Sequence, residues 1–173
     1  MREKTRNERY SEKKKNAISI PLSLASVNFH CDDNLAFLIR TAACFGINTI
    51  HVIGHIPPRK VLFNASGSLI DYIELKQYSK PSHFLDWVRK SDVTLVSAEL
   101  DDEAEPLYNH SFSFEKETLI VLGNERIGVP SEILFNSKKL FIPMLGTGFC
   151  LNTSQTGTAF VSEYMRQYLS GKQ

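Results

Sequence analysis

Short apolar runs alternate with amphipathic stretches along most of the chain. Residues 34–45 carry apolar side chains at helical spacing, and Gly46 is placed to end that helix. The runs between such stretches are rich in β-branched residues, which is typical of strands. Residues 54–68 contain Pro57 and Pro58 and are expected to form a loop. The pattern predicts strands at 17–25, 49–53, 72–75, 93–98, 118–122 and 140–144, and helices at 34–45, 81–90, 130–136 and 152–169.

This alternation of strands and helices determines the expected fold class. Strands that are joined through helices run parallel, and a parallel sheet is buried on both faces. We therefore expect an α/β fold of the Rossmann-like kind, with a mostly parallel sheet and helices on both faces. The pattern contains no internal repeat and no interdomain linker, so residues 16–173 are expected to form one domain.

Composition narrows the class of protein. Hydrophobic residues make up 42% of the chain and charged residues 23%, which is normal for a globular domain. No apolar run approaches the roughly 20 residues of a membrane span, and the charged N-terminus does not resemble a secretory signal. We expect a cytoplasmic protein. The three cysteines and five histidines lack the spacing of a disulfide scaffold or a zinc site, so no metal is expected.

The N-terminal segment is strongly basic, although the whole chain is nearly neutral. Residues 1–15 carry seven basic and three acidic side chains, whereas the rest of the chain carries thirteen basic and sixteen acidic ones. A basic arm can gain affinity for phosphate backbones by releasing counterions. A solvated, frayed terminus explains the same charges without a partner. We expect a flexible arm, with Lys13, Lys14 and Lys15 as its candidate contacts to nucleic acid.

Polar or glycine-rich segments follow three of the predicted strands. Residues 32–34 open the helix that carries Arg40, and residues 123–128 and 146–154 follow later strands. Ligands of open α/β sheets bind at the carboxyl ends of the strands, where such segments lie. The dinucleotide-binding G-x-G-x-x-G and the phosphate-binding G-x-x-x-x-G-K-[ST] motifs are absent. A nucleoside-like cofactor would therefore contact the late loops, although tight turns explain the same glycines.

Three of these segments carry recognisable motifs. N-L-A-F-L-I-R-T-A-A-C-F-G occupies residues 34–46, and V-L-G-N-E-R-I-G occupies residues 121–128. The third motif combines I-P-M-L-G at residues 142–146 with L-N-T-S at residues 151–154. In this order, the segments resemble the signature motifs of the SpoU/TrmH-type RNA 2′-O-ribose methyltransferases of the SPOUT superfamily. The resemblance spans about residues 18–170.

The resemblance implies a fold and an activity. In this family the C-terminal segment forms a deep trefoil knot, S-adenosylmethionine binds in the knot, and a homodimer formed through the knot region completes the active site. The implied reaction moves a methyl group from S-adenosylmethionine to a ribose 2′-hydroxyl of tRNA or rRNA. Because the donor is already activated, the enzyme must mainly align the hydroxyl and help to remove its proton.

The resemblance also assigns catalytic candidates. Arg40 would lie beside the ribose and assist activation of the hydroxyl; otherwise it is a surface arginine paired with Asp33 or Glu125. Asn34 would orient Arg40 or the substrate, and it would also serve as a helix cap. Glu125 would pair with Arg40 or Arg126 in the site, or remain a solvated loop acid.

Further candidates lie at the third motif and beside the strands. Asn152 would act in the site and Ser154 would contact the RNA, although both suit a helix cap. A glycine at position 123 would permit close approach of a ligand to the backbone. The implied cofactor contacts, mostly through the backbone, are Ala98, Gly123, Ile142 and Leu151.

Two features depart from the family pattern. Cys150 stands where the family usually has serine, and a thiol is a weaker hydrogen bonder than a hydroxyl. The sequence shows no additional RNA-recognition domain, which leaves the basic arm and the dimer surface to hold RNA. Two other functions follow: a non-catalytic RNA-binding or assembly factor on the same fold, or a methyltransferase that modifies a base. The intact motifs around Arg40 and Asn152 favour ribose over base.

Overall fold

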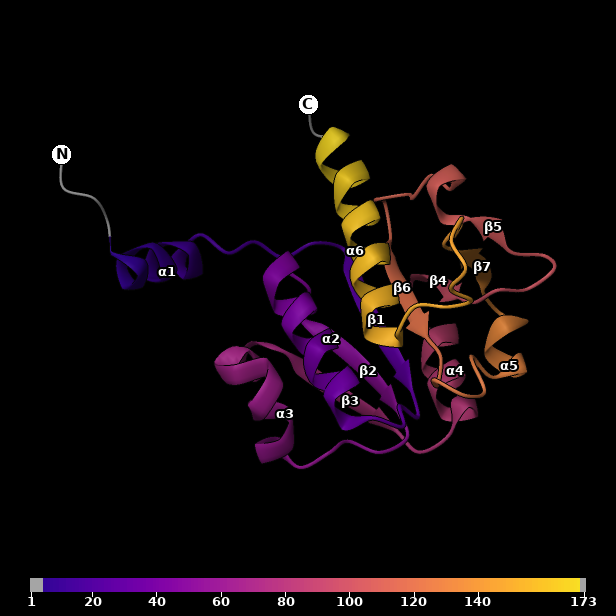
Figure 1. The fold of residues 1–173 in the computed structure, drawn as a ribbon, viewed down its shortest axis with the longest axis horizontal. Helices are drawn as coiled ribbons and strands as arrows, with labels where there is room; N and C mark the ends of the chain where they lie inside the picture. Colours follow the sequence, from indigo (N-terminus) through magenta and orange to yellow (C-terminus); the bar gives the residue numbers. More distant parts are fainter. Residues whose placement is uncertain (1–4, 172–173) are drawn as a thin grey trace.

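Seven strands form one sheet in the computed structural model, which describes residues 5–171 (Figure 1). Each pair of neighbouring strands is parallel, which confirms the expected α/β class. The order across the sheet is β3-β2-β1-β6-β4-β7-β5. The strands are β1 (Leu22–Val27), β2 (Thr49–Ile53), β3 (Glu74–Tyr78), β4 (Val93–Ala98), β5 (Glu105–Pro106), β6 (Glu117–Leu122) and β7 (Lys138–Phe141).

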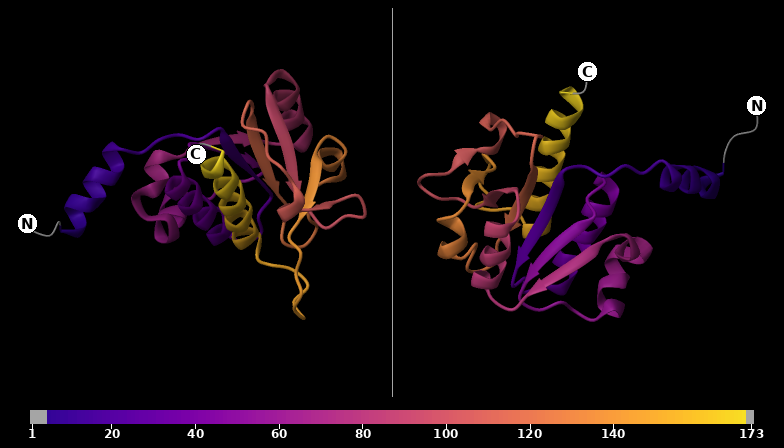
Figure 2. Two further views of the ribbon diagram at one scale, coloured as in Figure 1. Left: turned by 90° about the horizontal axis from the view of Figure 1, so that it is seen from above. Right: turned by 180° about the vertical axis from the view of Figure 1, so that it is seen from behind.

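Helices cover both faces of the sheet (Figure 2). The helices of the described residues are α1 (Arg6–Lys15), which lies away from the sheet, and α2 (Asp32–Phe45), α3 (Arg59–Ser66), α4 (Pro81–Lys90), α5 (Ser131–Leu134) and α6 (Thr153–Ser170), with 3₁₀ turns η1 (Gly67–Tyr72) and η2 (Leu107–Asn109). Successive side chains of a strand point to opposite faces. Leu24 therefore joins the core that contains Leu38 of α2 and Phe160 of α6, whereas Ala25 joins the core that contains Phe84 of α4.

Residues 59–66 form α3, so the prediction of a loop at 54–68 was wrong there. Pro58 directly precedes the first turn of this helix, where the missing N–H costs nothing. Leu62 is the one apolar residue of α3 that is fully buried, so the segment lacks the long apolar stripe that marks α2. The two prolines that predicted a loop therefore lie just before the start of a helix.

Several element boundaries also differ from the predicted ones. The first strand begins at Leu22 rather than at residue 17, and Ile18 remains exposed. The strand expected at 72–75 lies at 74–78, after the 3₁₀ turn η1. The last strand ends at Phe141, before Pro143, whose nitrogen cannot donate to a neighbouring strand. Strands 49–53 and 93–98 and helix 81–90 have the predicted bounds.

The basic N-terminal segment contains helix α1, which the sequence pattern did not predict because the segment has no apolar stripe. Thr5 and Glu8 form a capping box, with the Thr5 N–H donating to the Glu8 carboxylate at 2.7 Å. Lys14 Nζ lies 4.9 Å from the centre of the Tyr72 ring. In Figure 1, α1 stands apart from the sheet. Residues 1–4 of the expected arm lie outside the described residues, and the division at residue 15 stays a prediction.

The carboxyl ends of β1, β6 and β4 lie side by side at one edge of the sheet. Leu122 at the end of β6 pairs with Ser26 of β1 on one side and with Ala98 of β4 on the other. The loops that leave these strands are consequently neighbours. The loop after β7, residues 142–152, approaches the same edge because β7 pairs with β4. Sheet topology thus gathers the three motif segments.

Candidate functional site

A cavity of about 490 Å³ lies at the carboxyl ends of β4, β6 and β7. Its volume falls within the range of typical small-molecule sites. Its apolar wall includes Leu122, Leu140 and Phe160, and its polar side is made by the loops after the strands. All four predicted cofactor positions line the cavity: Ala98, Gly123, Ile142 and Leu151.

Three polar side chains from different motifs form one hydrogen-bonded chain beside the cavity. The Asn152 side-chain amide donates to Asn34 Oδ1 at 3.0 Å, and Asn34 Nδ2 donates to Glu125 Oε1 at 2.5 Å. Glu125 and Asn152 line the cavity, while Asn34 is buried behind them. This hydrogen-bonded chain fixes the three motif segments relative to one another. If either partner moved away, the buried Asn34 amide would lose a hydrogen bond and the fold would lose stability.

Glu125 caps helix α2 from a distant part of the sequence. Its carboxylate accepts the backbone N–H groups of His30 at 2.7 Å and of Cys31 at 3.1 Å. Cys31 is the N-cap residue and provides no side-chain cap of its own. Partial burial raises the pKa of Glu125, but the hydrogen bonds from His30, Asn34 and Cys31 outweigh it and hold that pKa below its ordinary value.

The expected partners of Glu125 and the expected cap role of Asn34 were both wrong. Glu125 bonds to Asn34 and to backbone N–H groups rather than to an arginine, and Arg126 Nη2 instead approaches His30 Nε2 at 3.2 Å. Asn34 lies in the third position of α2, where its side chain faces Glu125 instead of the helix end. Both differences arise because two loops far apart in sequence meet at the start of α2.

The loop after β6 folds back on itself at its two glycines. Asn124 and Gly128 exchange backbone hydrogen bonds of 3.1 and 3.0 Å, and Gly128 has a φ of +69°. A Cβ placed on Gly123 would lie 2.4 Å from the carbonyl carbon of Gly128 and 2.6 Å from Val129 N. The close approach expected at Gly123 is therefore to the backbone of its own loop. Its place beside the cavity is nevertheless as predicted.

Asn152 is the N-cap of α6, as one of the two sequence interpretations predicts. Its Oδ1 accepts the Ser154 N–H at 2.9 Å and the Ser154 hydroxyl at 2.7 Å. Ser154 is buried, and its observed contacts are those of a helix start; its contact with RNA stays a prediction. Thr153 Oγ1 donates to the Gly123 carbonyl at 3.0 Å, which ties α6 to the loop after β6.

Arg40 does not reach the cavity of its own chain. It lies on α2 with an exposed side chain, and its Nη1 donates to the Ala65 carbonyl of α3 at 3.3 Å. It pairs with neither Asp33 nor Glu125, the two partners that a purely structural arginine was expected to have. The structure thus brings Asn34, Glu125 and Asn152 together but leaves Arg40 on a different side of α2.

Lys13, Lys14 and Lys15 lie in the last turn of α1 and are exposed. Lys14 faces the Tyr72 ring, so one of the three contacts the folded body. Among residues 5–171, no group of three or more histidine, cysteine or acidic side chains is arranged to hold a metal ion.

The sequence model of the SpoU rRNA Methylase family matches residues 21–161, well over half of the chain. The chain belongs to this family. The matched region contains all three motif segments and the strands that carry the cavity.

Curated members of the SpoU family include two informative relatives. The 23S rRNA (uridine(2479)-2′-O)-methyltransferase of Streptomyces viridochromogenes is 29% identical over 145 residues, covering 80% of this chain and 50% of the relative. The tRNA (guanosine(18)-2′-O)-methyltransferase of Escherichia coli strain K12 is 21% identical over 147 residues, covering 84% of this chain and 63% of the relative. The chain therefore spans between half and two thirds of the length of these relatives.

Solved structures of SpoU proteins share the fold. The A. aeolicus TrmH/SpoU tRNA modifying enzyme superposes with a TM-score of 0.79 at 20% identity, covering 96% of this chain and 85% of that chain. The SpoU methyltransferase AviRb from Streptomyces viridochromogenes, in complex with AdoMet, superposes with a TM-score of 0.73 at 25% identity, covering 86% of this chain and 58% of that chain.

In this SpoU family member the cavity also includes residues that the motifs did not single out. Glu99, Phe149 and Thr156 line it. Glu99 directly follows β4, so its position at a strand end was the one available signal, but none of the three motifs includes it. Thr156 lies one turn into α6 and gave no signal, because its approach to the cavity depends on how α6 packs.

Proposed function

We propose that this chain is an RNA methyltransferase that transfers the methyl group of S-adenosylmethionine to a ribose 2′-hydroxyl of tRNA or rRNA in the cytoplasm. The observation that carries the proposal is the convergence of all three motifs on one cavity, joined by the Asn152–Asn34–Glu125 chain. Family membership and the names of the relatives support the reaction and its RNA substrates. No helix among residues 5–171 is long and apolar enough to cross a membrane.

The residues around the cavity suit an adenosyl cofactor. Ile142 and Leu151 supply apolar surface for a flat base, while Gly123 and Ala98 offer backbone groups at strand ends. Bound there, S-adenosylmethionine would supply an activated methyl group. The Asn152–Asn34–Glu125 chain would keep the loops after β1, β6 and β7 in the geometry that holds the cofactor.

We assign to Arg40 the activation of the 2′-hydroxyl, acting in the cavity of a second copy of the chain. Its exposed guanidinium lies outside the cavity of its own chain and makes one hydrogen bond of 3.3 Å to Ala65. The loops around the cavity also expose large apolar side chains, which is typical of a surface that another subunit covers. These side chains are Ile127, Met144, Leu145 and Phe149. A homodimer through this region, with the C-terminal segment knotted, would place Arg40 and the cavity of opposite subunits together.

The RNA would extend beyond the site onto helix α1. Lys13 and Lys15 are exposed on this helix, and the aromatic ring of Tyr10 is half exposed on it. Basic side chains with an accessible ring suit a nucleic-acid backbone and an unpaired base. Lys14 lies over the Tyr72 ring and gives this helix a contact with the folded body.

Methyl transfer from labelled S-adenosylmethionine to tRNA or rRNA transcripts tests the proposal. Nucleoside mass spectrometry is expected to find 2′-O-methylated ribose and no methylated base. The Arg40→Ala variant is expected to lose about a hundredfold or more in turnover while binding the cofactor as before. The matched control is Arg59→Ala, which removes an exposed arginine of the neighbouring helix α3 and should leave turnover unchanged.

Mixing two inactive variants tests the shared site. Arg40→Ala and Asn152→Ala chains, unfolded and refolded together, should regain activity that neither has alone, because one mixed cavity keeps all its groups. No recovery would argue against Arg40 acting across subunits. Binding of cofactor and RNA by the wild-type chain without any transfer would support the non-catalytic alternative and refute the methyltransferase.

A further inference from the structure

Glu99 lies at the wall of the cavity and has no role in the function described so far. It is the first residue after β4, next to Ala98, and its backbone N–H donates to the Leu140 carbonyl at 3.1 Å. The side chain is half-buried, and it borders the same cavity as the proposed cofactor positions Gly123 and Ile142.

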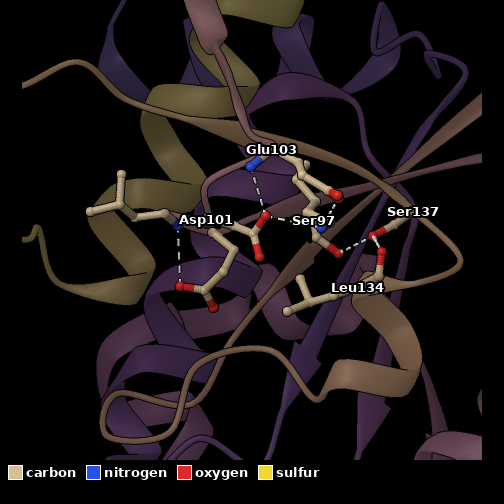
Figure 3. A network of polar contacts seen from close by, with 8 residues as sticks. Ser97, Asp101, Glu103, Leu134 and Ser137 are labelled. Carbon is tan, nitrogen blue, oxygen red and sulfur yellow. Dashed lines mark hydrogen bonds and ion pairs between the residues drawn. The ribbon is translucent and has the colours of Figure 1, made fainter.

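Three other acidic side chains of this loop form ion pairs with lysines, and Glu99 does not. Lys139 Nζ contacts Asp101 at 2.9 Å and Glu103 at 2.7 Å, and Lys138 contacts Glu105 at 2.7 Å. Among the described residues, the Glu99 carboxylate has hydrogen bonds to two backbone N–H groups, those of Val129 at 2.8 Å and of Leu100 at 3.2 Å. Figure 3 shows the polar contacts of Asp101 and Glu103 in this loop, including the hydrogen bond from the Glu103 N–H to Asp101.

The Glu99 carboxylate is held in place with acceptor capacity to spare. Each of its two oxygens carries two lone pairs and accepts one backbone N–H, Oε2 from Val129 and Oε1 from Leu100. Gly128 makes room for it, because a Cβ on Gly128 would lie 2.4 Å from Glu99 Oε2. A carboxylate that is fixed by backbone groups at the edge of a cavity is suited to accept two O–H groups from a ligand.

We propose that Glu99 binds the ribose of the cofactor by accepting hydrogen bonds from its vicinal 2′- and 3′-hydroxyls. This assignment rests on the proposed function, because it takes an adenosyl compound as the occupant of the cavity. The position of Glu99 directly after β4 supports this role, because an acidic residue at a strand end is a common acceptor for a ribose hydroxyl in α/β folds. Glu99 would thereby make the site selective for ribonucleosides over deoxyribonucleosides.

Calorimetric binding of S-adenosylhomocysteine and of its 2′-deoxy counterpart tests the assignment without catalysis. The wild-type protein is expected to prefer the ribose compound by about tenfold or more, the loss expected when a charged acceptor misses a hydroxyl. In Glu99→Gln, whose amide oxygen can still accept the Val129 N–H, that preference should fall at least fivefold, roughly the larger part of the same hydrogen-bond contribution. Affinity for the deoxy compound, which keeps the 3′-hydroxyl, should fall less than affinity for the ribose compound.

The control is Glu103→Gln, which alters an acid of the same loop that pairs with Lys139 and does not line the cavity; it should keep the full preference. An undiminished preference in Glu99→Gln would overturn the assignment. Equal weakening of both ligands would also overturn it, because Glu99 would then only anchor Val129. If the wild-type protein binds neither ligand, the proposed function fails together with this assignment.

Discussion

At the scale of single residues, the site depends on one buried polar side chain, Asn34, whose two partners line the cavity. Asn34 uses both ends of its amide, donating to Glu125 and accepting from Asn152, and it is 4% exposed. Such a side chain is costly to change, because a replacement that cannot make both hydrogen bonds leaves a buried polar group without its partner. Glu125 is similarly committed, so neither residue is free to move a proton without disturbing the loops.

Replacing Asn34 by aspartate tests how much the Asn152–Asn34–Glu125 hydrogen bonds depend on an amide donor at position 34. The new carboxylate would face the Glu125 carboxylate at hydrogen-bond distance, and the fold should lose about 2–4 kcal/mol at neutral pH. Because a shared proton restores the hydrogen bond, the pKa of the new group is raised. The deficit in the free energy of unfolding should therefore shrink as the pH falls through that pKa.

Urea unfolding of Asn34→Asp at several pH values measures this effect. The matched control is Asp33→Asn, which alters the exposed neighbour on the same helix and should change stability by less than about 1 kcal/mol. A deficit in Asn34→Asp that does not vary with pH would contradict the pairing with Glu125.

At the scale of elements, helix α2 is defined at both ends by groups outside it. Its start is capped by Glu125, and its end is closed by Gly46, which has a φ of +80° and donates its N–H to the Ala42 carbonyl. A Cβ at Gly46 would also lie 2.3 Å from the Ile18 carbonyl oxygen. The helix end therefore requires glycine for two reasons: its backbone conformation and the close approach of the Ile18 carbonyl.

Gly46→Ala and Gly46→Asn together separate these two requirements. Asparagine tolerates the left-handed conformation better than alanine, but both add a Cβ. If the Ile18 carbonyl is the main obstacle, both variants should lose about 2 kcal/mol or more of unfolding free energy. Gly148→Ala, where an added Cβ meets no atom within 4 Å, is the control for chemical denaturation. Full recovery of stability in Gly46→Asn would leave backbone conformation as the sole cause.

At the scale of the whole molecule, the face of the sheet opposite α2 and α6 contains a buried histidine. His51 of β2 is 1% exposed, bonds to the Tyr78 hydroxyl at 3.0 Å, and lies 4.2 Å from the Trp87 ring between centroids. Burial, with a smaller effect from the charge of Lys76, lowers the pKa of His51 to about 4. The folded protein therefore holds this ring neutral at a pH where the unfolded chain protonates it.

Stability should consequently fall as the pH drops from about 6.5, the ordinary histidine pKa, to about 4. Within this window the unfolded chain binds a proton that the folded chain does not, and the full cost is about 3 kcal/mol at most. His51→Gln should remove this part of the pH dependence, whereas His55→Gln, at an exposed histidine, should keep it. Melting temperatures of the three proteins between pH 4 and 8 measure the difference, and parallel curves would contradict it.

The sequence by itself determined the parallel α/β class, helix 81–90, strands 49–53 and 93–98, and the loops that carry the motifs. These features follow from local periodicity and from residues close together in the chain, so a linear reading reaches them. The resemblance to a known family added Asn34, Glu125 and Asn152 as site residues. It could not say how they touch.

Tertiary structure alone decided those contacts. Asn34 meets Glu125 across 91 positions and Asn152 across 118, so no local pattern encodes either hydrogen bond. The same holds for the cap that Glu125 places on α2, for the glycine packing at Gly123, and for the turn of Arg40 away from its own cavity. Each depends on the strand order, which brings distant loops to one edge of the sheet and fixes which side chains face one another.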